Sequence, residues 1–162
     1  MSYELGDIVS ALIMNGVEDS QSTGKLRPAV VVHRPDRHYL GVAGLTTSSA
    51  YRDGTPRIGF SGRAAGLNQD GYLWGGKLVR IHATIHVRHA IGRCYPQMAR
   101  DIVTVTDPGT LNHDDAQAFL EACGGIPPRP GPGIVDCPLC EVTYRREGDE
   151  EHIACRTVLG IR

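Results

Sequence analysis

Short β-branched apolar segments, separated by Gly, Pro, Asp or Asn, dominate the first 94 residues of the chain. Five of these segments are expected to be β-strands: residues 5–13, 27–34, 38–46, 56–60 and 77–85. Short strands with frequent turns are typical of a small barrel or sandwich. The polar stretch at residues 14–24 carries no packing signal, and we expect a mobile or functional loop there.

The apolar period becomes helical after Cys94. The stretch "YPQMARDIV" (residues 95–103) has a proline near its start and places Met98 and Ile102 on one face. In "NHDDAQAFLEAC" (residues 112–123), Asn112 is an expected N-cap that precedes two acidic residues of the first turn. We therefore expect a mainly β fold with helices packed on it.

A segment rich in proline and glycine divides the chain. The stretch "GGIPPRPGPG" has almost nothing to bury and is typical of a semi-stiff linker. We expect three parts: a β-barrel with its helices at residues 1–123, the linker at 124–133, and a tail at 134–162. The tail is too short to build a hydrophobic core alone.

The tail contains two pairs of candidate metal ligands. Cys137 and Cys140 form a C-x2-C pair, and His152 and Cys155 form an H-x2-C pair twelve residues later. A β-hairpin pattern ("EVTYRR", then "HIAC") lies between and around them, so the sequence predicts a small zinc-ribbon-like hairpin with one structural Zn²⁺. Four protein ligands leave no open position for chemistry. The alternatives are incidental packing of these groups or a redox pair at the C-x2-C motif.

Charge is segregated along a chain whose net charge is −1. Residues 25–100 contain 12 Lys and Arg against 3 Asp, a net charge of +9, while the flanking segments carry −10. Clustered basic residues favour a polyanionic partner such as a nucleic acid. The alternative is that the acidic flanks neutralise the basic centre in the folded protein.

The N-terminal residues and the cysteines bear on location. The start "MSYELGDIVS" has neither a basic nor an apolar stretch, and no apolar run approaches the about 20 residues that span a membrane. We expect a cytoplasmic protein without a membrane partner, whose cysteines are thiols or metal ligands. Cys94 and Cys123 are expected to be small buried residues.

Three features of the basic segment suggest chemistry. Pro28 restricts Arg27 to an extended conformation at the start of a buried strand, although a solvated arginine would fit the same pattern. Trp74 in "GYLWGG" either stacks on a base or plugs the barrel. The histidines of "HATIHVRH" have helical spacing, but their β-branched neighbours favour a strand or bend. We expect solvated or phosphate-facing rings there, and a metal site is the alternative.

These segments together resemble the MazF/PemK-like toxins of bacterial toxin–antitoxin systems. The resemblance lies in "GDIV" at 6–9, "RPAVVV" at 27–32, "VAGLTTSS" at 42–49, "GL" at 66–67 and "IGR" at 91–93. It covers about residues 5–105 and excludes the linker and tail. It implies an SH3-like β-barrel, a homodimer, an antitoxin protein as partner, and metal-independent endoribonuclease activity on single-stranded RNA.

The resemblance also implies roles for particular residues. Arg27 matches the catalytic arginine and Thr46 the active-site threonine, with Thr47 the alternative if the strand register shifts. We expect further basic and aromatic side chains of the central segment to contact RNA: Lys25, Arg52, Arg57, Trp74, Lys77, Arg80 and His82.

One position departs from the family pattern. Many members have an acidic residue followed by Gln in the strand before the last helix, where this chain has Arg80-Ile81 and then His82. The alternative function is therefore a non-catalytic nucleic-acid-binding or assembly protein on the same barrel, with the zinc tail contacting a partner.

Overall fold

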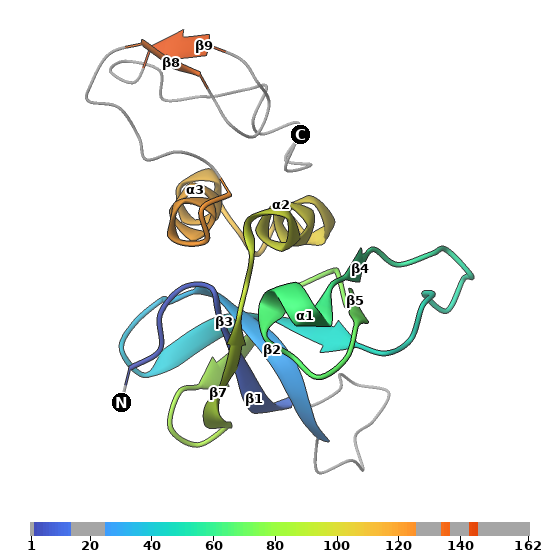
Figure 1. Ribbon diagram of the computed structural model, residues 1–162. Helices are drawn as coiled ribbons and strands as arrows, with labels where there is room; N and C mark the ends of the chain where they lie inside the picture. Colours follow the sequence, from blue (N-terminus) through green and yellow to red (C-terminus); the bar gives the residue numbers. More distant parts are fainter. Residues whose placement is uncertain (1, 14–24, 126–133, 137–142, 146–162) are drawn as a thin grey trace.

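The computed structural model describes residues 2–13, 25–125, 134–136 and 143–145 of the chain (Figure 1). In these residues the fold is mainly β, with one antiparallel sheet of seven strands. The strands follow the order β4-β5-β3-β2-β1-β7, and β6 also pairs with β3. Their bounds are β1 Asp7–Ile13, β2 Lys25–His33, β3 Tyr39–Thr46, β4 Gly59–Phe60, β5 Gly71–Leu73, β6 Val79–His82 and β7 Val87–Arg93.

The five predicted strands are present as β1, β2, β3, β4 and β6, the last two shorter than predicted. The histidine-rich segment forms a strand, a turn and a strand, so the expectation of a strand or bend is confirmed. Two strands of the seven-stranded sheet were not predicted. β5 has three residues, too few to show a period, and β7 is an exposed edge strand without an alternating apolar pattern.

The sheet separates two groups of buried apolar side chains. Neighbouring residues of β2 point to opposite faces, so that Val30 packs toward the helices and Val31 packs in the second group. All four residues of the run at 29–32 have no exposed surface. The prediction of a strand buried on both faces is confirmed.

Helices α2 (Pro96–Val105) and α3 (His113–Ala122) lie side by side over one face of the sheet (Figure 1). Their buried side chains, including Met98, Ile102 and Phe119, complete the first apolar group. Asn112 is the N-cap of α3, and its Oδ1 accepts a hydrogen bond from the backbone N–H of Asp115 at 2.8 Å. No helix in the described part of the chain is long and apolar enough to cross a membrane.

Cys94 and Cys123 are both buried free thiols at the base of these helices, as predicted. A hydrogen bond to Cys123, together with burial, raises the pKa of the Cys94 thiol far above its usual range. The same hydrogen bond lowers the pKa of Cys123. The pair is part of the apolar group between sheet and helices.

In the tail, strand β8 (Ile134–Asp136) pairs antiparallel with β9 (Thr143–Arg145). β9 falls in the predicted strand "EVTYRR", but its partner precedes the C-x2-C pair, where the β-branched Ile134 and Val135 favour a strand. The predicted zinc ligands Cys137, Cys140, His152 and Cys155 lie outside the described residues, as do the loop at 14–24 and most of the linker.

Candidate active-site cavity

A cavity of about 350 Å³ opens where β2 and β3 meet the short helix α1 (Gly62–Ala65) and the loop that follows it. The three residues matched to catalytic positions, Arg27, Thr46 and Thr47, all line it. The remaining lining residues are Pro28, Leu45, Phe60, Gly66, Leu67, Asn68, Gln69, Asp70, Gly71 and Ile91. The structure therefore brings Arg27 together with two adjacent threonines about 20 positions later in the sequence.

Arg27 lies in β2, where its backbone pairs with Ala11 of β1. Its side chain is half-buried, and the guanidinium carbon lies 5.3 Å from the centre of the Trp74 ring. The Nε atom of Arg27 is buried and has no hydrogen-bond partner among the residues that the structure describes. Because an unpaired buried N–H is costly, this atom is suited to an acceptor oxygen supplied by a ligand.

Thr46 is the last residue of β3, Thr47 follows it, and both line the cavity. The Oγ1 atom of Thr46 accepts a hydrogen bond from the backbone N–H of Ser48 at 3.1 Å. Since a hydroxyl both accepts and donates, its proton is still available to a ligand oxygen. Thr47 is exposed at the rim. The two candidates for the active-site threonine, Thr46 and Thr47, thus line the same cavity.

The cavity combines an apolar interior with an amide rim. Leu45 and Phe60 are buried in its wall, while Asn68 and Gln69 are exposed at its edge. Asp70 belongs partly to the scaffold, because its Oδ1 accepts a hydrogen bond from the backbone N–H of Gly62 at 2.8 Å. No sequence pattern predicted an individual role for the residues of this wall, apart from the resemblance at residues 66–67.

A glycine sets the close approach of β5 to this wall. A Cβ at Gly71 would lie 2.9 Å from ring atoms of Phe60 and 2.9 Å from the carbonyl oxygen of Thr46. No real side chain tolerates such contacts without displacing its neighbours. Gly71 therefore fixes how closely Phe60 and Thr46 lie beside the cavity.

Trp74 and Arg57 form an ordered stack next to Arg27. The Arg57 guanidinium carbon lies 4.1 Å from the centre of the Tyr51 ring and 5.1 Å from that of Trp74. Arg57 also donates hydrogen bonds to the carbonyl oxygens of Ala50, Leu73 and Trp74. Trp74 is 37% exposed, so it does not plug the sheet. Arg57 is occupied in holding the loop after β3 against β5, and the Trp74 ring lies at the surface beside Arg27.

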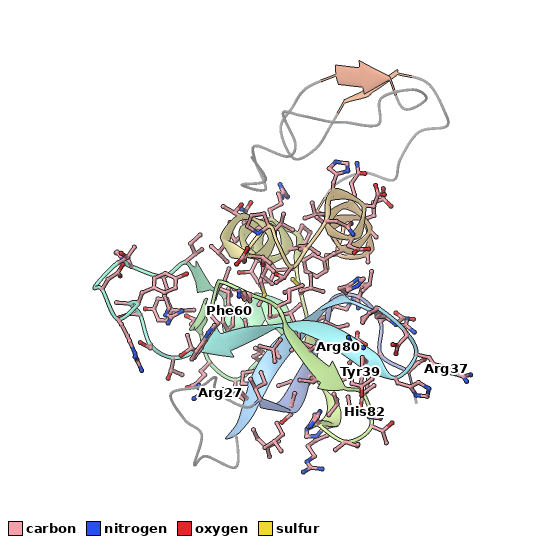
Figure 2. The ribbon with its side chains drawn as sticks, turned by 180° about the vertical axis from the view of Figure 1, so that it is seen from behind. Arg27, Arg37, Tyr39, Phe60, Arg80 and His82 are labelled. Carbon is pink, nitrogen blue, oxygen red and sulfur yellow. The ribbon has the colours of Figure 1, made fainter. Side chains whose placement is uncertain are left out.

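The other predicted RNA contacts are distributed around the molecule. Arg52 is exposed in the loop after β3, and Lys77 is exposed three residues after Trp74. Lys25 begins β2, with its backbone paired to Ile13. Arg80 and His82 belong to β6 and lie on the other side of the molecule from Arg27 (Figure 2). Among the residues that the structure describes, the cavity gathers the three predicted catalytic residues and none of the predicted RNA contacts, although Trp74 lies beside Arg27.

Two of the three clustered histidines order the turn between β6 and β7. The backbone N–H of His82 donates to Nδ1 of His86 at 2.8 Å, and Nδ1 of His82 accepts from the backbone N–H groups of Thr84 and Ile85. Within the described ranges, no three His, Cys, Asp or Glu side chains are grouped so that they could hold a metal ion. These histidines therefore have a structural task in the turn.

The cavity combines groups of the kind that bind anions with apolar surface. One guanidinium and two hydroxyls line it beside an apolar interior, and two amide side chains lie at its edge. No protein-family model matches this chain, and no curated protein matches it either. The residues that line the cavity are therefore the basis for assigning a function.

Proposed function

We propose that this protein is an endoribonuclease of the MazF/PemK-like kind, which cleaves single-stranded RNA at short sequences without a catalytic metal. The observation that carries the proposal is the unpartnered Nε of Arg27 beside Thr46 and Thr47 in one cavity. In this proposal the protein acts in the cytoplasm as a homodimer and has an antitoxin protein as a partner.

The proposed reaction is an internal transesterification. The 2′-oxygen of a nucleotide attacks the adjacent phosphorus, the bond from phosphorus to the 5′-oxygen breaks, and a 2′,3′-cyclic phosphate and a 5′-hydroxyl result. The 2′-hydroxyl loses one proton to water, and the 5′-oxygen gains one. Arg27 stabilises the charge on the non-bridging oxygens through its planar fork, and a threonine hydroxyl donates one further hydrogen bond. Arginine is not a proton shuttle here, because free guanidinium groups stay protonated up to pH values above about 12.

The cavity wall supports a single-stranded substrate. Its volume of about 350 Å³ falls in the range of small-molecule pockets, and its interior is formed by Leu45, Phe60 and other apolar side chains. An unstacked base can enter such a pocket, whereas the bases of a duplex are held in the helix. Asn68 and Gln69 at the edge offer amide groups that can pair with the edge of a base.

We also propose the finer architecture implied by the resemblance. The curved sheet corresponds to an SH3-like barrel, and the tail corresponds to a zinc-ribbon-like hairpin that binds one Zn²⁺ through Cys137, Cys140, His152 and Cys155. Three thiolates and one imidazole are a donor set that zinc prefers in structural sites. The ion would stabilise the tail and take no part in cleavage.

Substitutions in the cavity test the proposed function. Arg27→Ala should reduce the cleavage rate on a long single-stranded RNA by about 10²–10³, the usual effect of losing one transition-state contact. Arg27→Lys should restore little, because an ammonium group lacks the fork. Arg100→Ala removes an exposed arginine on α2 and serves as the matched control. A fully active Arg27→Ala protein would contradict the proposal.

One observation favours the second candidate, a non-catalytic nucleic-acid-binding protein. Among the described residues that line the cavity, Asp70 is the only carboxylate, there is no imidazole, and one oxygen of Asp70 already accepts a backbone hydrogen bond. A general base for the 2′-hydroxyl is thus less evident than the phosphate-binding groups. Wild-type protein that binds RNA and leaves it intact would favour this candidate.

A further inference from the structure

The predicted RNA contacts fall into two groups at opposite ends of β3. The cavity lies at Thr46, the last residue of β3, whereas His82 and Arg80 of β6 pair with Tyr39 and Gly41 at its beginning. Seven residues of extended strand span about 23 Å. Figure 2 shows Arg27 on one side of the molecule and Tyr39, Arg80, His82 and Arg37 on the other. One nucleotide cannot contact both groups.

The second group is an ordered set of flat side chains. The Arg80 guanidinium carbon lies 4.3 Å from the centre of the Tyr39 ring, and the His82 ring meets Tyr39 edge-on at 5.2 Å. His38 stacks on His82 with ring centres 6.2 Å apart. Tyr39 is half-buried, while the Arg80 side chain is 65% exposed. The guanidinium plane of Arg80 is therefore supported by a ring and still reaches solvent.

A turn holds this set in place. Asp36 Oδ1 accepts hydrogen bonds from the backbone N–H groups of His38 at 2.7 Å and Tyr39 at 2.9 Å, and Asp36 Oδ2 lies 3.8 Å from Arg80. The hydrogen bond from His38, supported by that from Tyr39 and by the charge of Arg80, lowers the pKa of Asp36. This carboxylate is thus ionised at neutral pH and already engaged by its neighbours.

Positive charge surrounds the same turn. Arg34 and Arg37 are exposed and line a second hollow of about 340 Å³ between the turn and α3. Asp115 lines this hollow as well, but its carboxylate lies 3.4 Å from Nδ1 of His33. Arg34 and Arg37 make no ion pair within the described residues. The two guanidinium groups can therefore meet anions from outside.

We propose that this surface, formed by Arg34, Arg37, Tyr39 and Arg80, is a second binding site for the same RNA strand. The inference rests on the proposed function, because it extends the nucleic acid from the cavity to the far end of β3. A base stacks on the Arg80 plane that Tyr39 supports, and phosphates contact Arg34 and Arg37. Flat stacking groups beside unpaired cations are typical of sites for single strands. The surface increases affinity and has no part in cleavage.

The test measures binding of the full-length protein to a 20-nucleotide single strand with 2′-O-methyl groups, which cannot be cleaved. Arg37→Ala should reduce the slope of log affinity against log salt by about 0.7, the effect of one lost phosphate contact on a single strand. Arg80→Ala removes the stacking plane and should weaken binding about fivefold or more. Tyr39→Leu should weaken binding similarly with an unchanged slope, since no charge is removed. Arg100→Ala should alter neither value.

Cleavage assays separate this site from the cavity. On unmodified RNA, Tyr39→Leu should raise KM and leave kcat unchanged, whereas Arg27→Ala should lower kcat. If Tyr39→Leu does not fold, Arg80→Lys replaces it, because it retains the charge and removes the stacking plane at an exposed position. Because the modified strand requires no cleavage, a protein that cuts no RNA would contradict the proposed function and leave the binding test intact.

Two results would overturn the second site. One is binding of the modified strand by Arg80→Ala and Tyr39→Leu within twofold of the wild type. The other is a glutamate-rich peptide that binds the wild type and is lost in both variants while RNA binding stays unchanged, since the surface would then be a protein-binding site.

Discussion

Replacing Arg27 by Met should leave the protein as stable or make it more stable, although the cavity loses its central cation. The Met side chain ends with a methyl group at the position of Nε and so removes this buried donor, which has no hydrogen-bond partner among the described residues. Relief of one buried unpaired donor is worth about 1–3 kcal/mol. Loss of the contact with the Trp74 ring at 5.3 Å costs about 0.5–1 kcal/mol.

The free energy of unfolding of Arg27→Met should therefore exceed that of the wild type by between about 0 and 2.5 kcal/mol. For a chain of this length, 1 kcal/mol shifts Tm by about 2–4 °C, so Tm should rise by up to about 10 °C. Cleavage should fall by about 10²–10³ in the same variant. A variant that is more stable but cleaves more slowly would identify Arg27 as a residue that serves ligand binding at a cost in stability.

Arg57→Met is the matched control, because Arg57 lies against the same tryptophan. Its guanidinium donates to three backbone carbonyl oxygens, so its removal should cost at least about 1.5 kcal/mol and lower Tm by at least about 3 °C. Thermal unfolding followed by circular dichroism measures both variants. If Arg27→Met lowers Tm by as much as Arg57→Met and keeps full activity, Arg27 is a structural residue and the reasoning is refuted.

Three further variants test other parts of the structure. Gly71→Ala should cost about 1–3 kcal/mol in urea unfolding and slow cleavage, since its Cβ displaces Phe60 or Thr46; wild-type values would contradict the close approach. Asn112→Ala should lower the free energy of unfolding by about 1 kcal/mol and leave cleavage unchanged. An unchanged free energy of unfolding would show that α3 does not need this cap. Cys140→Ser should reduce zinc from one ion per chain to none and expose only residues after 132 to protease; zinc-free wild-type protein would refute the tail site.

The strands and helices that could be predicted are those with a clear local pattern. The apolar run of β2 required burial on both faces, and Asn112 with two following acidic residues marked the start of α3. β5 escaped prediction because its three residues carry no period. Its position depends on the pairing of Gly71 with Phe60 of β4, which only the folded chain creates.

The candidate site was predictable in its centre and not at its edges. Arg27 stood out because Pro28 fixes its backbone, but that its Nε is buried and unpaired follows from the folded structure alone. From the cluster of basic residues in the sequence, Arg57 and Arg80 were both predicted to contact RNA. Hydrogen bonds to carbonyl oxygens occupy Arg57, and strand register carries Arg80 to the far end of β3. Neither fact is encoded in local composition.

The chemical ends of the RNA fragments test the central claim most directly. Full-length protein is incubated with a long single-stranded RNA in the presence of EDTA, and the fragment ends are identified by mass spectrometry. The account predicts fragments with 2′,3′-cyclic phosphates and 5′-hydroxyls, and their loss in Arg27→Ala. Fragments with 5′-phosphates, cleavage that requires Mg²⁺, or bound RNA that stays intact would contradict it.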